Sequence, residues 1–136
     1  TGLRLSPVTP ANDAGPDSDP AATYGHVAHA LAPLGLAYLH VVEGQTGGPR
    51  DYAPFDFAAL KAQFGGPWMV NNGYSREMAL AAVVSGAADV VAFGRAFISN
   101  PDLVHRLREN LPLAKANSAT FYGGGAEGYT DYPVAP

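Results

Sequence analysis

The sequence predicts an α/β fold that is half of a (β/α)8 barrel. Short apolar runs typical of buried strands occur four times, a helix start follows each of them, and glycine-rich or polar segments separate them. Strands that alternate with helices in this way form parallel β-α-β units with right-handed crossovers. Four such units are half of an eightfold barrel, and a small doubly wound open sheet is the alternative. A G-x-G-x-x-G fingerprint would favour the open sheet, but none follows a predicted strand.

The composition fits an ordinary globular domain and argues against several classes of function. Of the 136 residues, 47% are hydrophobic and 15% are charged, and the formal net charge of -4 argues against a basic patch for nucleic acid. No block of like charges and no apolar run of bilayer length indicates a membrane partner. The lack of cysteine removes disulfides and thiolate metal sites and is compatible with a reducing compartment, so we expect a cytoplasmic protein. Because the sequence starts at Thr1 and not at Met, and its first residues already indicate a strand, we expect a piece of a longer protein.

The first unit begins with a strand at residues 2–7, which Pro7 ends. Residues 9–20 are rich in Pro, Asn, Asp, Gly and Ser and predict a loop. Ser18, Asp19 and Pro20 then start a helix that ends by residue 35. One face of this helix carries the apolar side chains of Tyr24, Val27, Ala28 and Leu31.

The second unit has a strand at residues 36–43 and a loop at residues 44–54. This loop is longer than a connection requires, which often indicates a functional role. Asp56 caps the following helix, which ends at Gly65. The apolar side of that helix carries Phe57, Leu60 and Phe64.

The third unit has a strand at residues 68–71 and a turn at residues 72–74. Ser75 caps its helix, which runs to about Ser85 with Gly86 as the predicted C-cap.

The fourth unit has a short buried strand at residues 90–93, followed at once by Gly94 and Arg95. Asn100 then caps the last helix, which carries proline at its first position.

Residues 116–136 do not continue this alternation of strands and helices. The predicted boundary therefore separates a barrel portion, residues 1–115, from a C-terminal segment, residues 116–136. The segment gathers four aromatic side chains among glycines: Phe121, Tyr122, Tyr129 and Tyr132. Clustered aromatic rings are costly to leave in water, so we expect this segment to dock, and a frayed end is the alternative.

The carboxyl ends of the predicted strands hold the candidates for ligand binding, because barrel ligands bind at that end. Gly73, Gly94 and Arg95 suit a phosphate group, since glycine allows close approach to the backbone and arginine is a forked cationic donor. In the second half of a barrel they would follow strands seven and eight, where barrels commonly bind phosphate. A plain glycine turn and a surface ion pair are the alternatives.

Three further polar residues near strand ends have two interpretations each. Arg4 either points into the barrel, where it needs an anion or a hydrogen-bonding ring, or points outward. His40 is a ligand or base, or more often a satisfied residue of an inner strand. For Glu43 we prefer a role in holding a loop or a backbone amide. No metal-ligand set is evident, because His26 and His29 share a helix without a third ligand.

Five segments carry a family resemblance: LRLSP at residues 3–7, YLHVVE at 38–43, NNGY at 71–74, FGRAFISNPDL at 93–103 and TFYGGGAEGYTDYP at 120–133. Together they resemble the old yellow enzyme family of FMN-dependent ene-reductases. The resemblance is collinear, covers nearly the whole chain and matches the C-terminal part of such an enzyme. It implies the second half of a (β/α)8 TIM barrel, completed by a missing N-terminal half.

The resemblance implies an oxidoreductase in which NADPH or NADH reduces FMN. The flavin then reduces the C=C bond of an activated alkene such as an enone, a maleimide or a nitroalkene. The implied partners are the N-terminal half of the barrel, on the same or a separate chain, and a small-molecule alkene. The family's proton-donating tyrosine and carbonyl-binding pair lie earlier in the barrel, so we expect no catalytic residue in this chain.

The resemblance also assigns residues to the FMN site. Arg4 matches the arginine at the pyrimidine edge of the flavin, where its charge would stabilise the reduced ring. Gly73 and Tyr74 match the backbone amides at the phosphate. Gly94 and Arg95 match the second phosphate loop, with Arg95 as the ionic clamp.

Tyr122, with Phe121 beside it, matches the aromatic lining on the substrate side of the flavin. Asn71-Asn72 departs from the small or glycine-rich pair that many members carry. Two other hypotheses remain open: a phosphate- or nucleotide-binding module without redox activity, and a truncated product without function.

Overall fold

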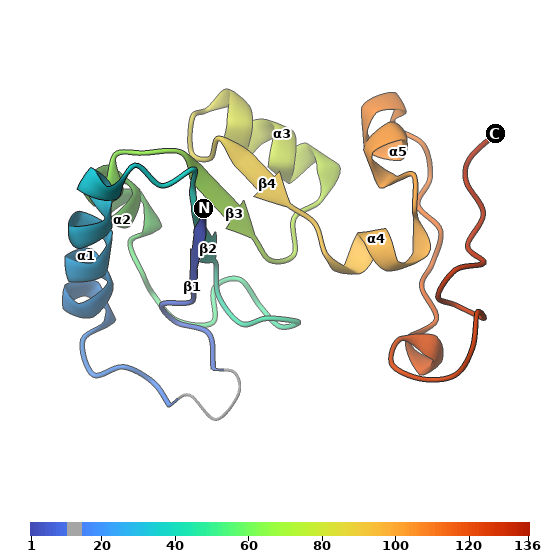
Figure 1. Ribbon diagram of the computed structural model, residues 1–136, viewed down its shortest axis with the longest axis horizontal. Helices are drawn as coiled ribbons and strands as arrows, with labels where there is room; N and C mark the ends of the chain where they lie inside the picture. The colour runs from blue at the N-terminus through green and yellow to red at the C-terminus, as the bar shows by residue number, and fades with distance from the viewer. Residues whose placement is uncertain (11–14) are drawn as a thin grey trace. The chain divides into compact units, whose positions relative to one another are not determined.

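The computed structural model describes residues 1–10 and 15–136 (Figure 1). Part of the predicted loop, residues 11–14, lies outside the described residues. The chain forms two compact units, residues 1–92 and 93–136, which we describe in turn.

The first unit is built on a parallel sheet of four strands in the order β1-β2-β3-β4. The strands are β1 (Leu3–Leu5), β2 (Leu39–Val42), β3 (Trp68–Asn71) and β4 (Val90–Ala92). Consecutive strands are neighbours, and the chain between each pair contains a helix. The alternating parallel architecture predicted from the sequence is therefore confirmed.

Helices α1 (Pro20–Leu31) and α2 (Phe57–Phe64) lie side by side against one face of this sheet (Figure 1). A one-turn helix, η1 (Ala32–Leu34), extends α1, and α3 (Arg76–Val84) precedes β4. The buried core between helices and sheet consists of Ala28, Leu39, Val41, Leu60, Phe64, Trp68, Val70 and Ala88. Burial of these apolar side chains is the main force that holds the unit together.

Helices α2 and α3 begin at the predicted capping residues, and α1 begins within the predicted start at Ser18–Pro20, with Asp19 as its cap. The side chains of Asp19, Asp56 and Ser75 accept hydrogen bonds from backbone N–H groups three residues on, at 3.0, 2.8 and 3.2 Å. These bonds satisfy donors that a helix start leaves unpaired. At the end of α3 the cap is Ser85, and Gly86 follows it at φ 74°, so the predicted C-cap was wrong by one residue.

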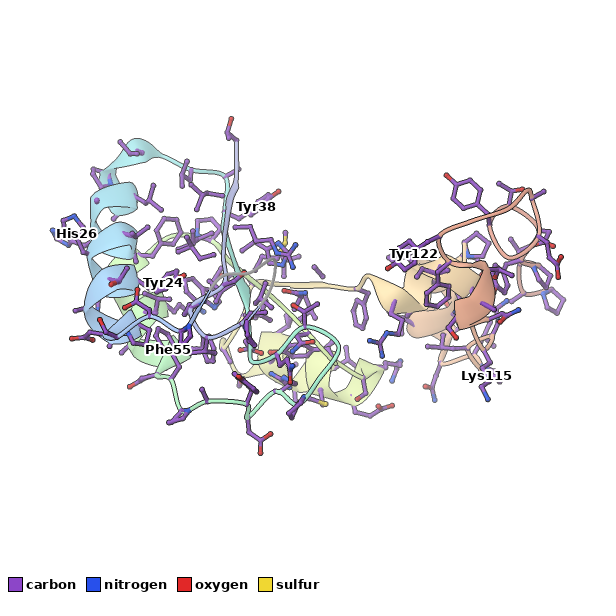
Figure 2. The ribbon with its side chains drawn as sticks, turned by 90° about the horizontal axis from the view of Figure 1, so that it is seen from below. Tyr24, His26, Tyr38, Phe55, Lys115 and Tyr122 are labelled. Carbon is purple, nitrogen blue, oxygen red and sulfur yellow. The ribbon has the colours of Figure 1, made fainter. Side chains whose placement is uncertain are left out.

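The other face of the sheet carries a row that pairs Arg4, His40, Met69 and Val90 across the four strands. Side chains alternate along a strand, so this row points away from the core row of Leu5, Val41, Val70 and Val91. The face opposite α1 and α2 therefore carries the polar side chains of Arg4 and His40 beside the apolar side chains of Met69 and Val90. His26, by contrast, stands on the outer side of α1, away from the sheet (Figure 2).

The second unit contains α4 (Arg95–Ser99), α5 (Leu103–Glu109) and the one-turn η2 (Ser118–Thr120). The short α4 was not predicted. The prediction of Asn100 as a helix cap was wrong, since α5 starts after Asp102. The amide of Asn100 instead donates to the Ala96 carbonyl at 2.8 Å and accepts from the Ala114 N–H at 2.7 Å. Asn100 thus joins α4 to the chain beyond α5.

The C-terminal segment is fixed near its end by an ion pair on α5. Arg106 pairs with Asp102 at 2.7 Å and donates to the Pro133 carbonyl at 3.1 Å, and Asp102 accepts the Ala135 N–H at 2.7 Å. The tyrosines earlier in this segment are more exposed to solvent, with Tyr122 97% exposed (Figure 2). Docking of this segment near a flavin stays a prediction, as does the boundary at residue 115.

Among the described residues, no helix combines the length and the apolar character needed to cross a bilayer.

Candidate functional site

The turn after β3 is the best-defined candidate for ligand binding in the first unit. Asn72 and Gly73 are consecutive residues with positive φ, at 102° and 65°. Glycine adopts such angles without strain, whereas asparagine does so less readily and needs local support. In the part of the chain that the structure describes, the N–H groups of Gly73 and Tyr74 donate no hydrogen bond. Two adjacent backbone donors therefore remain available at the carboxyl end of a parallel strand.

The loop after β2 supports this turn. The side-chain amide of Asn72 donates to the backbone carbonyls of Glu43 and Gln45, at 2.5 and 2.9 Å. The Glu43 carboxylate pairs with Arg50 and accepts the Tyr74 hydroxyl at 2.6 Å. Glu43 thus holds a loop and a turn, which confirms the role preferred from the sequence.

Arg50 belongs to the loop, and its side chain reaches the turn. Its guanidinium carbon stands 4.0 Å from the centroid of the Tyr74 ring, a cation–π contact. A Cβ placed on Gly73 would meet the Arg50 side chain at 3.6 Å, which is ordinary van der Waals contact. The Nε atom of Arg50 is buried and has no hydrogen-bond partner among the described residues.

These contacts set the protonation of Tyr74. Burial first, and then the hydrogen bond and negative charge of Glu43, raise the pKa of Tyr74 well above its usual value. The phenol is therefore neutral at physiological pH and donates its hydrogen bond to the Glu43 carboxylate.

Arg4 and His40 face each other across β1 and β2. The imidazole Nε2–H of His40 donates to the Asn71 side-chain oxygen at 3.0 Å. Burial first, and then the charge of Arg4, lower the pKa of His40, while the bond to Asn71 opposes them. His40 is thus a hydrogen-bonded residue of the sheet, in agreement with the more common interpretation of it, while a role as ligand or base stays a prediction. Arg4 is exposed on the same face.

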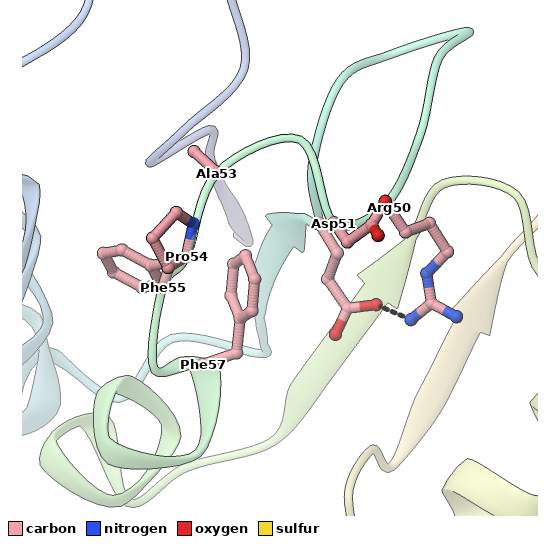
Figure 3. Close-up of a pocket in the computed structure, with 7 residues that line it drawn as sticks. Arg50, Asp51, Ala53, Pro54, Phe55 and Phe57 are labelled. Carbon is pink, nitrogen blue, oxygen red and sulfur yellow. Dashed lines mark hydrogen bonds and ion pairs between the residues drawn. The ribbon is translucent and has the colours of Figure 1, made fainter.

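A cavity of about 500 Å³ opens beside the loop after β2 (Figure 3). Phe55 and Phe57 form an apolar wall with ring centroids 4.8 Å apart, and the ion pair of Arg50 with Glu43 forms a charged side. No group of three or more metal-binding side chains occurs in residues 1–10 and 15–136.

The remaining predicted site residues belong to the second unit. Gly94 precedes the first turn of α4, at φ -106° and with open space where a Cβ would stand. Arg95 is exposed, and its side chain has no ion-pair or hydrogen-bond partner in the described part of the chain. Phe121 and Tyr122 form an edge-to-face pair with centroids 6.1 Å apart.

Sequence reasoning missed Arg50 and the supporting role of Asn72. Arg50 lies in a long loop whose path no periodicity reveals. For Asn72 a signal existed, because asparagine before glycine is common where the backbone takes positive φ.

Comparison with known proteins gives consistent results. The model of the NADH:flavin oxidoreductase / NADH oxidase family matches residues 1–114. The chain is 40% identical over 148 residues to 12-oxophytodienoate reductase 7 of Oryza sativa subsp. japonica, with 96% of this chain and 37% of the relative covered. It is 38% identical over 132 residues to the "Probable flavin mononucleotide-dependent alkene reductase" of Leishmania infantum, with 97% and 35% covered.

A solved structure is similar over the same extent. The old yellow enzyme from Trypanosoma cruzi matches with a TM-score of 0.90 and 36% identity, over 99% of this chain and 35% of that one. The chain thus spans little more than a third of the length of these relatives.

Proposed function

The chain belongs to the NADH:flavin oxidoreductase / NADH oxidase family, and from that premise we propose that it is the phosphate-binding part of an FMN-dependent ene-reductase. The related old yellow enzymes are TIM barrels, so the four parallel units are a portion of that fold, as predicted. The rest of the barrel is the partner that completes it, on the same or a separate chain. We call the two together the completed barrel. A cytoplasmic location stays a prediction.

The turn at Gly73 and Tyr74 carries this proposal. Its two available N–H groups are donors suited to phosphate oxygens, and Gly73 leaves the backbone open to a ligand. The residues present therefore fit the phosphate end of FMN. Charge-assisted hydrogen bonds of this kind are stronger than neutral ones.

The proposal also assigns Gly94 and Arg95 to the FMN phosphate, because they match the second phosphate loop of the family that the chain resembles. Arg95 contributes a guanidinium that is not committed to another described residue. Its forked donors suit a phosphate dianion.

Bound FMN supplies the hydride chemistry, with NADPH or NADH as the reductant and an activated alkene as the acceptor. The residues of this chain bind and orient it. Arg4, on the sheet face opposite α1 and α2, provides positive charge for the pyrimidine edge of the flavin. Tyr122 and Phe121 line the substrate side. The proton donor and the carbonyl-binding pair come from the rest of the barrel.

Titration of the apo form of the completed barrel with FMN and with riboflavin tests this proposal. Hydrogen bonds to a charged group contribute about 1.5–3 kcal/mol each, so FMN should bind at least about tenfold more tightly than riboflavin. Bound flavin should then be reduced anaerobically by NADH or NADPH and reoxidised by a maleimide.

Two results would contradict the proposal. Equal affinity for FMN and riboflavin would show that the phosphate group does not contribute to binding. Tight binding of many phosphorylated ligands, such as AMP, with no flavin preference and no maleimide reduction would favour a binding module without redox activity.

A further inference from the structure

Asn72 holds an unusual backbone conformation through its own side chain. Its φ of 102° is one that L-residues rarely adopt, and it stands directly before the positive φ of Gly73. Its amide group donates to two carbonyls of the neighbouring loop, those of Glu43 and Gln45. These two bonds join the turn after β3 to the loop after β2.

Glu43 and Arg50 contact the other two residues of the turn. The Glu43 carboxylate receives the Tyr74 hydroxyl, and the Arg50 side chain lies under Gly73 and against the Tyr74 ring. Because Arg50 pairs with Glu43, its positive charge is balanced within the cluster. Its contribution to the turn is therefore packing and orientation.

The loop that carries these side chains is itself anchored. The buried Thr9 hydroxyl donates to the Gly44 carbonyl at 2.5 Å, and the Gln45 N–H donates to the Pro49 carbonyl at 3.0 Å. A Cβ on Gly44 would stand 2.3 Å from the Arg50 carbonyl oxygen, so the two ends of the loop approach closely. The loop can therefore act as a fixed support.

We propose that Glu43, Arg50 and Asn72 are positioning residues that hold the Gly73–Tyr74 amides in place for the flavin phosphate. This inference rests on the proposed function. All three side chains act on one turn and none belongs to the apolar core. A turn held before the ligand arrives loses less conformational entropy on binding, so the support should appear as affinity for the phosphate group.

The test compares FMN and riboflavin affinities of Asn72→Gly and Glu43→Gln in the apo form of the completed barrel. Asn72→Gly tolerates the positive φ but removes both loop bonds, and Glu43→Gln keeps the shape but removes the charge. Each variant should weaken FMN binding about tenfold, equivalent to the loss of one or two hydrogen bonds, and change riboflavin binding less than about twofold.

Asn110→Gly is the matched control, because Asn110 also has positive φ, at 56°, but caps α5. It should leave both affinities unchanged. Proportional loss of FMN and riboflavin binding in the two variants would indicate a structural role only and overturn the inference, as would unchanged FMN binding. If Glu43→Gln does not fold, Asn72→Gly decides.

The same titration separates the two proposals. A wild type that does not distinguish FMN from riboflavin contradicts the phosphate site, and the positioning role with it. A wild type that does distinguish them, with an unchanged ratio in both variants, overturns the positioning role alone.

Discussion

The carboxylate of Glu43 accepts the phenol O–H of Tyr74 at 2.6 Å, across a sequence separation of 31 residues. This bond joins the end of β2 to the residue that follows the Gly73 turn. It makes the conformation of a candidate phosphate-binding turn depend on a neighbouring loop. Several measurable properties of the protein follow from this dependence and from the contacts around it.

Stability should fall at alkaline pH because of Tyr74. Its pKa is raised in the folded state, so above about pH 10 the unfolded chain loses the phenol proton first. Stabilisation that is complete below that pH is lost as the pH rises toward the folded-state pKa. Urea unfolding at increasing pH should show that the free energy of unfolding falls more steeply in wild type than in Tyr74→Phe. Equal slopes would contradict the assignment.

His40 should titrate below its usual pKa, for reasons that one substitution can separate. Burial and the charge of Arg4 both lower this pKa, so Arg4→Gln should raise it toward the ordinary value. Because the folded-state pKa is depressed, stability should decline as the pH falls below about 6.5. NMR titration of the imidazole in the apo protein measures the pKa. A value that stays the same in Arg4→Gln would exclude the electrostatic contribution.

The two glycines of the proposed phosphate site should respond differently to alanine. Gly73 has φ 65°, where a side chain costs about 1–2 kcal/mol, although its Cβ would find ordinary contacts. Gly94 has φ -106° and open space around it, so Gly94→Ala should change the free energy of unfolding by less than about 0.5 kcal/mol. Urea unfolding of both variants measures these changes, and equal decreases in the free energy of unfolding would refute the prediction.

The ion pair on α5 should control the end of the chain. Arg106 bonds Asp102 and the Pro133 carbonyl, and Asp102 accepts the Ala135 N–H. Arg106→Lys loses the forked geometry that makes two of these bonds at once. Hydrogen exchange of the Ala135 amide should accelerate about tenfold, since a lost bond is equivalent to about that factor. Arg108→Lys, at an exposed position on the same helix, is the control and should change nothing.

Much of the fold followed from local signals in the sequence. The strand at residues 68–71 and the caps Asp56 and Ser75 occur where predicted, because proline, glycine and capping side chains act within a few residues. Helix α1 likewise starts within the predicted Ser18–Pro20. The short α4 was missed because a helix of five residues shows no periodicity. Asn100 satisfied the local rule for a cap, but its side chain bonds to Ala114, a partner that only tertiary structure supplies.

The candidate site was predicted less completely than the fold. Glycines and arginines at strand ends can be predicted as site residues from their type and position, as Gly73 was. Arg50 does not, since its role depends on how a long loop returns to the end of β2 and meets Tyr74. Long-range side-chain pairs of this kind leave no spacing signal in a single sequence.

The most direct test of the account is the affinity of Arg95→Ala for FMN and for riboflavin in the completed barrel, with Arg108→Ala as a matched control. If Arg95 clamps the flavin phosphate, FMN binding should weaken by about ten- to a hundredfold, while riboflavin binding stays the same. If FMN affinity is unchanged, or if both ligands weaken equally, the chain does not bind the phosphate in the proposed way.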